Sequence, residues 1–193
     1  MMSKADVRRD ALKVRRSLSA EQVESLSERI QDALMVLPEF LEAGVVASYA
    51  AKSYEVQTGR MMLSALSSGK RLIVPRTDPR SISLSFREIR SLDQLAPGYL
   101  GIPEPPRKSK AVPLSESQLV VVPVVAWDDS GQRLGHGKGY FDRALRSRER
   151  AAAAGLAFES QRRGRLPVTS SDVALDIIVT ERRVLRFGGA SGG

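Results

Sequence analysis

One stretch, residues 118–145, constrains the fold of this chain more than any other. It opens on a run of valines between positions 120 and 125, and a short continuous apolar run is typical of a strand buried on both faces of a sheet. Turn-forming residues follow at 128–131, three alternating glycines lie at 135–139, and a helix is expected from Tyr140. The order strand, glycine loop, helix predicts a site for a nucleotide phosphate.

The chemistry of the glycine loop supports that interpretation. Alternating glycines let the backbone adopt positive φ and bring bare N–H groups close to an anion, and the helix behind them points its positive end the same way. Arg133 and Lys138 add positive charge, and Asp142 can hold a cation. The spacing matches neither a Walker A loop nor a dinucleotide fingerprint. A glycine-rich surface loop with a solvated lysine is the alternative interpretation of the pattern.

The residues of this stretch also form a longer signature. They read Asp-x-x-Gly-x-Arg-Leu-Gly and then Gly-x-Gly-Tyr-Phe-Asp-Arg, carried by Asp128, Gly131, Arg133, Leu134, Gly135, Gly137, Gly139, Tyr140, Phe141, Asp142 and Arg143. The signature resembles that of the 5-formyltetrahydrofolate cyclo-ligases, also called methenyltetrahydrofolate synthetases. The resemblance extends from Lys4 to Glu181, and it implies a three-layer α/β domain of the NagB/RpiA/CoA-transferase-like class.

Composition is compatible with a single domain of this kind. The chain has 193 residues, no cysteine and one histidine, which excludes disulfides and thiolate catalysis and leaves any histidine chemistry to His136. No apolar run approaches the roughly 20 residues that span a bilayer, and the N-terminus lacks the apolar stretch of a signal peptide, so a cytoplasmic protein is expected. The net charge of +8 favours an anionic partner such as ATP or a folate with a glutamate tail.

The pattern of apolar residues predicts alternating helices and strands, hence a largely parallel sheet flanked by helices. An amphipathic helix is expected over 3–18, with Val7, Ala11, Val14 and Leu18 on one stripe, and a second from Ser19, capped with Gln22, to before Pro38. The expected strands are 45–49, 71–75, 81–86 and 119–126. Further helices are expected from Thr58 to Ser68 and over 140–150, the latter continuing through Ala154 or breaking before Gly155. Residues 1–187 would form one domain, with 188–193 as a flexible tail.

The resemblance implies roles for residues that composition alone would leave as solvated charges. Lys4 and Arg8 match a Lys-x-x-x-Arg pair that reaches the ATP phosphates. Glu55, in a Glu-x-x-Thr pattern with Thr58, would hold the amino-pyrimidine ring of the folate. Gly101–Pro105 matches a loop near the substrate, and Asp172 would join Asp142 around magnesium.

The site residues implied by the resemblance fall into four groups. For ATP they are Lys4, Arg8, Arg133, Leu134, Gly135, His136, Gly137, Lys138, Gly139, Tyr140 and Phe141. For the folate they are Ala50, Glu55, Leu100 and Tyr140. Asp142 and Asp172 would bind Mg²⁺, and Arg133 and Lys138 would act on the transition state. Two departures concern the pocket: Val124-Val125 replaces a usual Gly-Leu and is expected to narrow it, and Ser171 replaces a frequent His.

The reaction implied is the ATP- and Mg²⁺-dependent closure of 5-formyltetrahydrofolate to 5,10-methenyltetrahydrofolate. A monomer acting on a reduced, possibly polyglutamylated folate is expected, without a nucleic-acid or membrane partner. Asp142→Ala is expected to abolish turnover and leave the fold intact. The alternatives are an ATP-dependent phosphotransferase with another acceptor, or a basic nucleic-acid-binding domain that uses the segment Arg143–Arg165.

Overall fold

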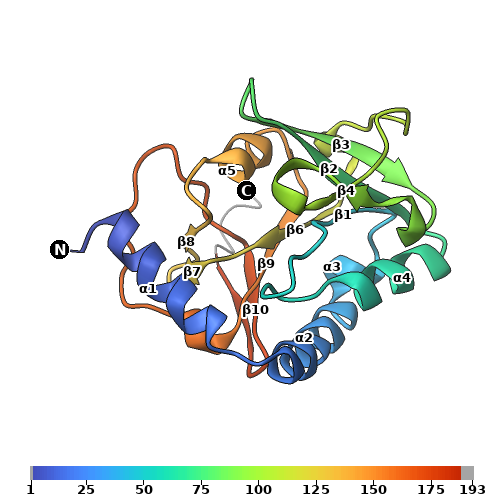
Figure 1. Cartoon of the computed structure of the whole chain (residues 1–193). Helices are drawn as coiled ribbons and strands as arrows, with labels where there is room; N and C mark the ends of the chain where they lie inside the picture. Colours follow the sequence, from blue (N-terminus) through green and yellow to red (C-terminus); the bar gives the residue numbers. More distant parts are fainter. Residues whose placement is uncertain (1, 188–193) are drawn as a thin grey trace, which may run out of the picture.

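A seven-stranded sheet forms the centre of the computed structural model, which describes residues 2–187. The strand order is β11-β10-β9-β6-β1-β2-β3 (Figure 1). The strands are β1 (Val45–Ala47), β2 (Arg71–Asp78), β3 (Ser83–Ile89), β6 (Leu119–Pro123), β9 (Ala152–Leu156), β10 (Ile177–Val179) and β11 (Val184–Arg186). The pairs from β10 through β9, β6 and β1 to β2 are parallel, and only the edge strands β3 and β11 run antiparallel. The predicted largely parallel sheet is confirmed.

Strand β6 lies at the centre of the sheet, as the valine run predicts. Val120 and Val122 pack into one apolar cluster, while Leu119 and Val121 pack into another, because successive side chains of a strand point to opposite faces. All four side chains are fully buried. The strand is therefore covered on both faces.

Helices cover both faces of the sheet and give the predicted three layers. Residues of α2 (Ala20–Met35) and α4 (Gly59–Ser67) pack into the cluster that contains Val121, and the short α5 (Tyr140–Leu145) contributes Leu145 to the cluster that contains Val120. Helix α1 (Lys4–Arg16) packs instead on a small hairpin of β7 (Ala126–Trp127) and β8 (Arg133–Leu134), as Figure 1 shows. Within residues 2–187, no helix has the length and apolar character needed to cross a membrane.

The remaining elements are short. They are α3 (Pro38–Leu41), the hairpin of β4 (Ala96–Pro97) with β5 (Pro103–Glu104), and the 3₁₀ turns η1 (Leu92–Gln94), η2 (Tyr99–Gly101), η3 (Leu114–Glu116) and η4 (Glu159–Gln161). The hairpin of β4 and β5 holds η2 at its tip.

Helix ends follow the sequence signals in part. The capping box of Ser19 and Gln22 forms, and Gly69 follows α4 at φ +76° as a glycine after a helix does. The predicted side-chain cap from Thr58 is absent, because its hydroxyl donates to the Tyr49 carbonyl at 2.8 Å instead. Thr58 therefore ties the start of α4 to the segment after β1.

The first helix differs from its predicted stripe at one position. Val7 and Ala11 are buried as expected, but the side chain of Val14 is 37% exposed. The buried residue of this turn is Arg15, at 1% exposure. A charged side chain thus points inward where the pattern predicts an apolar one.

The predicted helix over 140–150 is wrong beyond Leu145. Helix α5 has six residues, and the alanines that favour its continuation form strand β9 between β6 and β10. Alanine is the best helix former, but tertiary packing decides here: Ala153 and Ala154 are fully buried, each in the apolar cluster on its own face of the sheet.

The predicted end of the second strand at Pro75 is also wrong. Strand β2 continues to Asp78 and is paired with β3 along this length. Its other neighbour, β1, ends earlier, and the last pair between the two strands is Ala47 with Ile73. Proline cannot donate to a ladder, and at Pro75 the side toward β1 has no strand to donate to. The third expected strand is likewise shifted, from 81–86 to Ser83–Ile89.

Gly155→Ala is expected to destabilise the fold by about 1–3 kcal/mol through overpacking. A Cβ at Gly155 would overlap Cδ1 of Leu175 and lie 2.9 Å from Cγ2 of Val124, and both neighbours are buried. Urea unfolding followed by circular dichroism measures the effect. Gly164→Ala is the matched control, since a Cβ there meets nothing within 4 Å. Equal midpoints for the two variants would contradict the predicted overlap.

Candidate active site

A cavity of about 680 Å³ opens where the parallel strands end. Tyr49 and Ala50 come to it from the segment after β1, Pro75 and Thr77 from β2, and Pro123 from the end of β6. Loops at the carboxyl ends of parallel strands form the ligand sites of such sheets. The predicted convergence of these loops is confirmed.

All residues predicted for the site line this one cavity. They come from α1, the segment after β1, the β4–β5 hairpin, β8, the glycine loop with α5, and the segment before β10. They are Lys4, Arg8, Ala50, Glu55, Leu100, Arg133, Leu134, Gly135, His136, Gly137, Lys138, Gly139, Tyr140, Phe141, Asp142 and Asp172. The structure thus brings together positions up to 168 residues apart, such as Lys4 and Asp172.

The glycine loop connects β8 to α5 and forms one wall. Two of its three glycines have positive φ, Gly137 at +103° and Gly139 at +69°. The Nε of Arg8 donates to the Gly135 carbonyl at 2.7 Å, and a Cβ at Gly137 would lie 3.2 Å from the Arg8 guanidinium carbon. Glycine at 137 is therefore needed both for its backbone conformation and for the close approach of Arg8.

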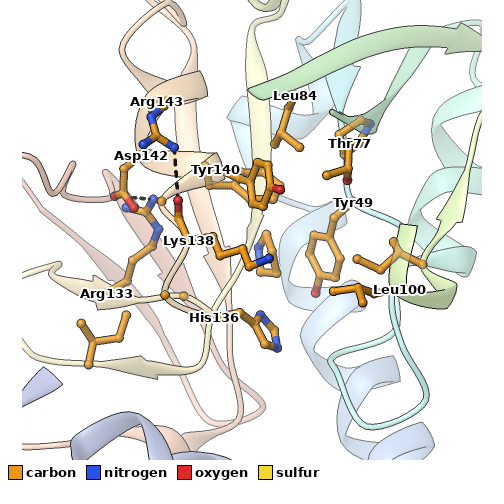
Figure 2. Close-up of a pocket in the computed structure, with 18 of the residues that line it drawn as sticks. Tyr49, Thr77, Leu84, Leu100, Arg133, His136, Lys138, Tyr140, Asp142 and Arg143 are labelled. Atoms are coloured by element: carbon orange, nitrogen blue, oxygen red, sulfur yellow. Dashed lines mark hydrogen bonds and ion pairs between the residues drawn. The ribbon is translucent and has the colours of Figure 1, made fainter. Parts of the chain in front are cut away.

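Lys138 extends from this wall across the cavity. Its Nζ donates to the hydroxyl of Tyr99 at 2.9 Å, a hydrogen bond that raises the pKa of the lysine. Figure 2 shows Lys138 and His136 pointing from the glycine loop toward Tyr49 and Leu100 on the opposite wall. Lys138 is therefore positively charged at neutral pH and lies at the place where the two walls meet.

Two carboxylates lie on the same side of the cavity as the glycine loop. Asp142 Oδ1 accepts hydrogen bonds from Arg133 Nη2 at 2.9 Å and from the Val173 N–H at 3.2 Å. Asp172 Oδ2 accepts from Lys4 and from Thr169. Burial acts to raise the pKa of Asp172, but these hydrogen bonds outweigh it and hold the pKa below its usual value. Asp172 is thus an anionic ligand at neutral pH.

These carboxylates fit a magnesium ion. Hydrogen bonds within the described chain use only Oδ1 of Asp142 and only Oδ2 of Asp172, so each has a second oxygen without a protein donor. Mg²⁺ is commonly bound by one or two carboxylates and completes its shell with waters and substrate phosphates. Residues 2–187 contain no group of three or more acidic, histidine or cysteine side chains that could hold a metal ion.

Glu55 contributes a buried carboxylate on another side of the cavity. Its Oε2 accepts from the Lys52 N–H at 3.0 Å, and its Oε1 lies 3.6 Å from Nε2 of His136. Burial lowers the pKa of His136 below its usual value, and the Glu55 carboxylate opposes that shift. Burial thus favours the neutral form of the imidazole.

Apolar and aromatic side chains complete the cavity. Leu84, Ile102 and Phe141 line it, and Leu100 is 66% exposed at φ +54°. Backbone strain of this kind clusters at ligand sites. Glu104 of the same hairpin turns away and accepts from the Thr77 N–H at 2.9 Å.

Several lining residues are missing from the predicted site. Lys52, Tyr99 and Arg146 reach the cavity through the tertiary fold. Arg143, which belongs to the signature, and Ser171, which replaces a frequent His, also line it, as does Leu84 of the strand expected over 81–86. Position next to a predicted residue could have indicated Tyr99 and Arg143. Arg15, behind the cavity wall, had no signal because its neighbours read as a solvated helix face.

The expectation that Val124 narrows the pocket is wrong. Its side chain belongs to the apolar cluster of Val120 and Val122 and lies against Gly155 and Leu175, and it is not among the residues that line the cavity. Its carbonyl is held by Arg15 and Gln161. The side chain of Val124 therefore fills space in the core and takes none from the pocket.

Tyr140→Phe is expected to stabilise the ligand-free protein by up to about 1 kcal/mol, because the buried Oη of Tyr140 has no hydrogen-bond partner within residues 2–187. Tyr49→Phe is the matched comparison in the same cavity. Its hydroxyl donates to the Val56 carbonyl at 2.8 Å, so its loss should cost about 1 kcal/mol. Urea unfolding of both variants checks this, and destabilisation of equal size in both would contradict it.

Comparisons with known proteins show the family of this chain. The sequence model of the 5-formyltetrahydrofolate cyclo-ligase family matches residues 1–181. A 5-formyltetrahydrofolate cyclo-ligase from Escherichia coli is 31% identical over 174 residues, which cover 88% of this chain and 96% of that protein. The solved structure of a 5,10-methenyltetrahydrofolate synthetase from Aquifex aeolicus superposes with a TM-score of 0.86 at 34% identity, covering 100% of this chain and 97% of the other.

A more distant structure shares the fold. A 5,10-methenyltetrahydrofolate synthetase from Mycoplasma pneumoniae superposes with a TM-score of 0.76 at 21% identity, covering 93% of this chain and 99% of that one. The match of the family model over most of the sequence and the identity with the Escherichia coli protein decide the assignment. This chain is an enzyme of the 5-formyltetrahydrofolate cyclo-ligase family.

Proposed function

We propose that the chain catalyses the ATP- and Mg²⁺-dependent closure of 5-formyltetrahydrofolate to 5,10-methenyltetrahydrofolate, with release of ADP and phosphate. The observation that carries the proposal is the single cavity in which a cationic glycine loop faces an aromatic and apolar wall with one buried carboxylate. A nucleotide triphosphate suits the first part, and a planar heterocycle with N–H donors suits the second.

The chemistry explains why ATP is needed. The formyl group on N5 is an amide, and its oxygen is a poor leaving group. The formyl oxygen attacks the γ-phosphorus as the bond to ADP breaks, and N10 then attacks the activated carbon as phosphate leaves and the N10 proton is lost. Phosphoryl transfer of this kind needs positioning and neutralisation of charge more than a covalent enzyme group, which suits a chain without cysteine.

The lining residues divide between those tasks. Lys4 and Arg8 clamp the nucleotide from α1, and the backbone of Gly135–Gly139 surrounds its phosphates. Lys138, which projects into the cavity, meets the charge that develops on the transferred group. Arg133 is 5% exposed and bonded to Asp142, so it supports transfer by fixing that carboxylate. A Mg²⁺ ion held by Asp142 and Asp172 would draw negative charge from the phosphate oxygens.

The folate assignment uses the opposite part of the cavity. Glu55 accepts the N–H donors of the amino-pyrimidine ring, and Leu100, Ala50 and Tyr140 contact its faces. Lys52, Arg143 and Arg146 add positive charge among the lining residues, which suits a carboxylate tail. The enzyme is expected to act as a monomer in the cytoplasm.

The alternative functions predict different results. Nucleic-acid binding by the segment Arg143–Arg165 is disfavoured because Arg148 pairs with Asp176 at 2.6 Å and Arg162 pairs with Asp129. Such binding would weaken steeply with salt and would not need Asp142. A phosphotransferase with another acceptor would bind ATP and leave the folate unchanged.

The test is the absorbance of the methenyl product after mixing the protein with 5-formyltetrahydrofolate and Mg-ATP. ATP-dependent growth that stops on addition of EDTA is the expected result. Reactions without ATP, and with ADP in its place, are the controls. A flat trace in a protein that binds ATP would defeat the folate assignment and keep the phosphate site.

A further inference from the structure

Arg15 is a buried charge that the proposed reaction does not use. Its side chain is 1% exposed at the C-terminal end of α1, and it is absent from the residues that line the cavity. Complete burial of a guanidinium costs several kcal/mol unless partners compensate, and an apolar residue of similar volume would fill the space without that cost. The partners of Arg15 therefore indicate what the charge does.

Those partners come from three segments that build the cavity wall. Nη1 donates to the Val124 carbonyl at 3.2 Å, after β6. Nη2 lies 3.3 Å from Nε2 of His136 in the glycine loop and 3.8 Å from Oε1 of Glu55 after β1. The guanidinium also lies over the ring of Tyr54, 4.9 Å from its centroid. One side chain thus contacts the segments that carry the predicted phosphate-binding and pterin-binding groups.

The geometry with His136 fixes the state of that ring. An arginine N–H can only donate, so Nε2 of His136 must accept, and the ring proton lies on Nδ1. The lowered pKa of His136 agrees with a neutral ring. Glu55 Oε1 consequently has Arg15 as its charged neighbour and a neutral imidazole, at 3.6 Å, as the other.

We propose that Arg15 is a positioning residue that holds the Glu55 carboxylate oriented toward the pterin of the folate. The proposal rests on the proposed function, and it assigns to Arg15 an effect on the folate that passes through Glu55. Arg15 contacts His136 from the set predicted for ATP. The lysines of that set, Lys4 and Lys138, bond instead to Asp172, Thr169 and Tyr99. Loss of Arg15 should therefore affect the folate more than the nucleotide.

Steady-state kinetics of Arg15→Met test the proposal. The KM for 5-formyltetrahydrofolate should rise about 10-fold, and the KM for ATP should change by less than about 3-fold. Arg15→Lys, which keeps a charge that can reach Glu55, should recover part of the folate affinity. Lys13→Met, an exposed cation on the same helix, is the matched control and should leave both constants unchanged.

A double-mutant cycle separates positioning from a general loss of structure. In a Glu55→Gln background, adding Arg15→Met should raise the folate KM by less than about 2-fold, because its path to the substrate has been removed. The same 10-fold rise in both backgrounds would overturn the proposal. If Arg15→Met does not fold, the cycle is run with Arg15→Lys, whose smaller rise in KM should likewise vanish in the Glu55→Gln background.

The wild-type rate separates this proposal from the one on which it rests. Wild-type protein that forms no methenyl product would defeat the proposed function and the role of Arg15 with it. Active wild type with independent, multiplicative effects of Arg15 and Glu55 would defeat the role of Arg15 alone.

Discussion

Asp142→Asn is expected to lower kcat by about 10²–10³-fold, the loss typical of removing one electrostatic group that acts on the transition state. The amide oxygen can still accept from Arg133 and from the Val173 N–H, which both bond to Oδ1. The negative charge and the second anionic oxygen are lost, so Mg²⁺ should bind more weakly. The measurement is kcat at saturating ATP and folate over a titration of Mg²⁺.

The control for Asp142→Asn is Asp129→Asn. Asp129 pairs with Arg162, its side chain is 56% exposed, and it is not among the residues that line the cavity. Its loss should leave kcat and the Mg²⁺ dependence as in wild type. An Asp142→Asn enzyme that stays active and needs no magnesium would rule out the assigned role of Asp142.

Asp142→Ala should behave differently from the asparagine variant. The sequence alone suggests that it leaves the fold intact, but Asp142 pairs with Arg133, whose side chain is 2% exposed. Removing the carboxylate leaves a buried guanidinium without its partner, which should cost about 2–3 kcal/mol. Low activity of Asp142→Ala could therefore arise from loss of the catalytic carboxylate or from unfolding of the protein. The free energy of unfolding, measured in urea, separates the two causes.

The sequence predicts the centre of this fold well because one residue type dominates there. A run of valines such as that of β6 is typical of a strand covered on both faces in a parallel sheet, and the glycines at 137 and 139 do adopt the positive φ that the loop requires. The residues of the signature stay together in space because they are close in the chain. The resemblance added Lys4, Glu55 and Asp172, which periodicity alone leaves as surface charges.

The errors arise where tertiary contacts outweigh local preference. Ala152–Leu156 is a strand because its small side chains fit between layers, although alanine favours a helix. Arg15 is buried because three loops supply its partners, and no local pattern shows those partners. Val124 follows the central strand and from its position is expected beside the pocket, but its side chain packs in the core against Gly155 and Leu175.

Glu55→Gln is expected to raise the KM for 5-formyltetrahydrofolate by about 10–100-fold and to leave the dissociation constant for ATP unchanged. Glu55 is 6% exposed, and within residues 2–187 its Oε1 accepts no hydrogen bond, so it can receive donors from a bound ring. A hydrogen bond to a buried charge contributes about 1.5–3 kcal/mol, which converts to that range of affinity. Kinetics for the folate and calorimetric titration of ATP measure the two quantities.

The comparison with Glu88→Gln shows whether the effect is specific to the pocket. Glu88 is a partly buried carboxylate on β3 that bonds to Arg71 at 2.9 Å, outside the cavity. Its amide variant should lose some stability and keep the folate KM of wild type. If Glu55→Gln also kept that KM, the carboxylate would have no part in holding the pterin. A rise in the folate KM with unchanged ATP affinity, by contrast, would place the two substrates in separate parts of one cavity.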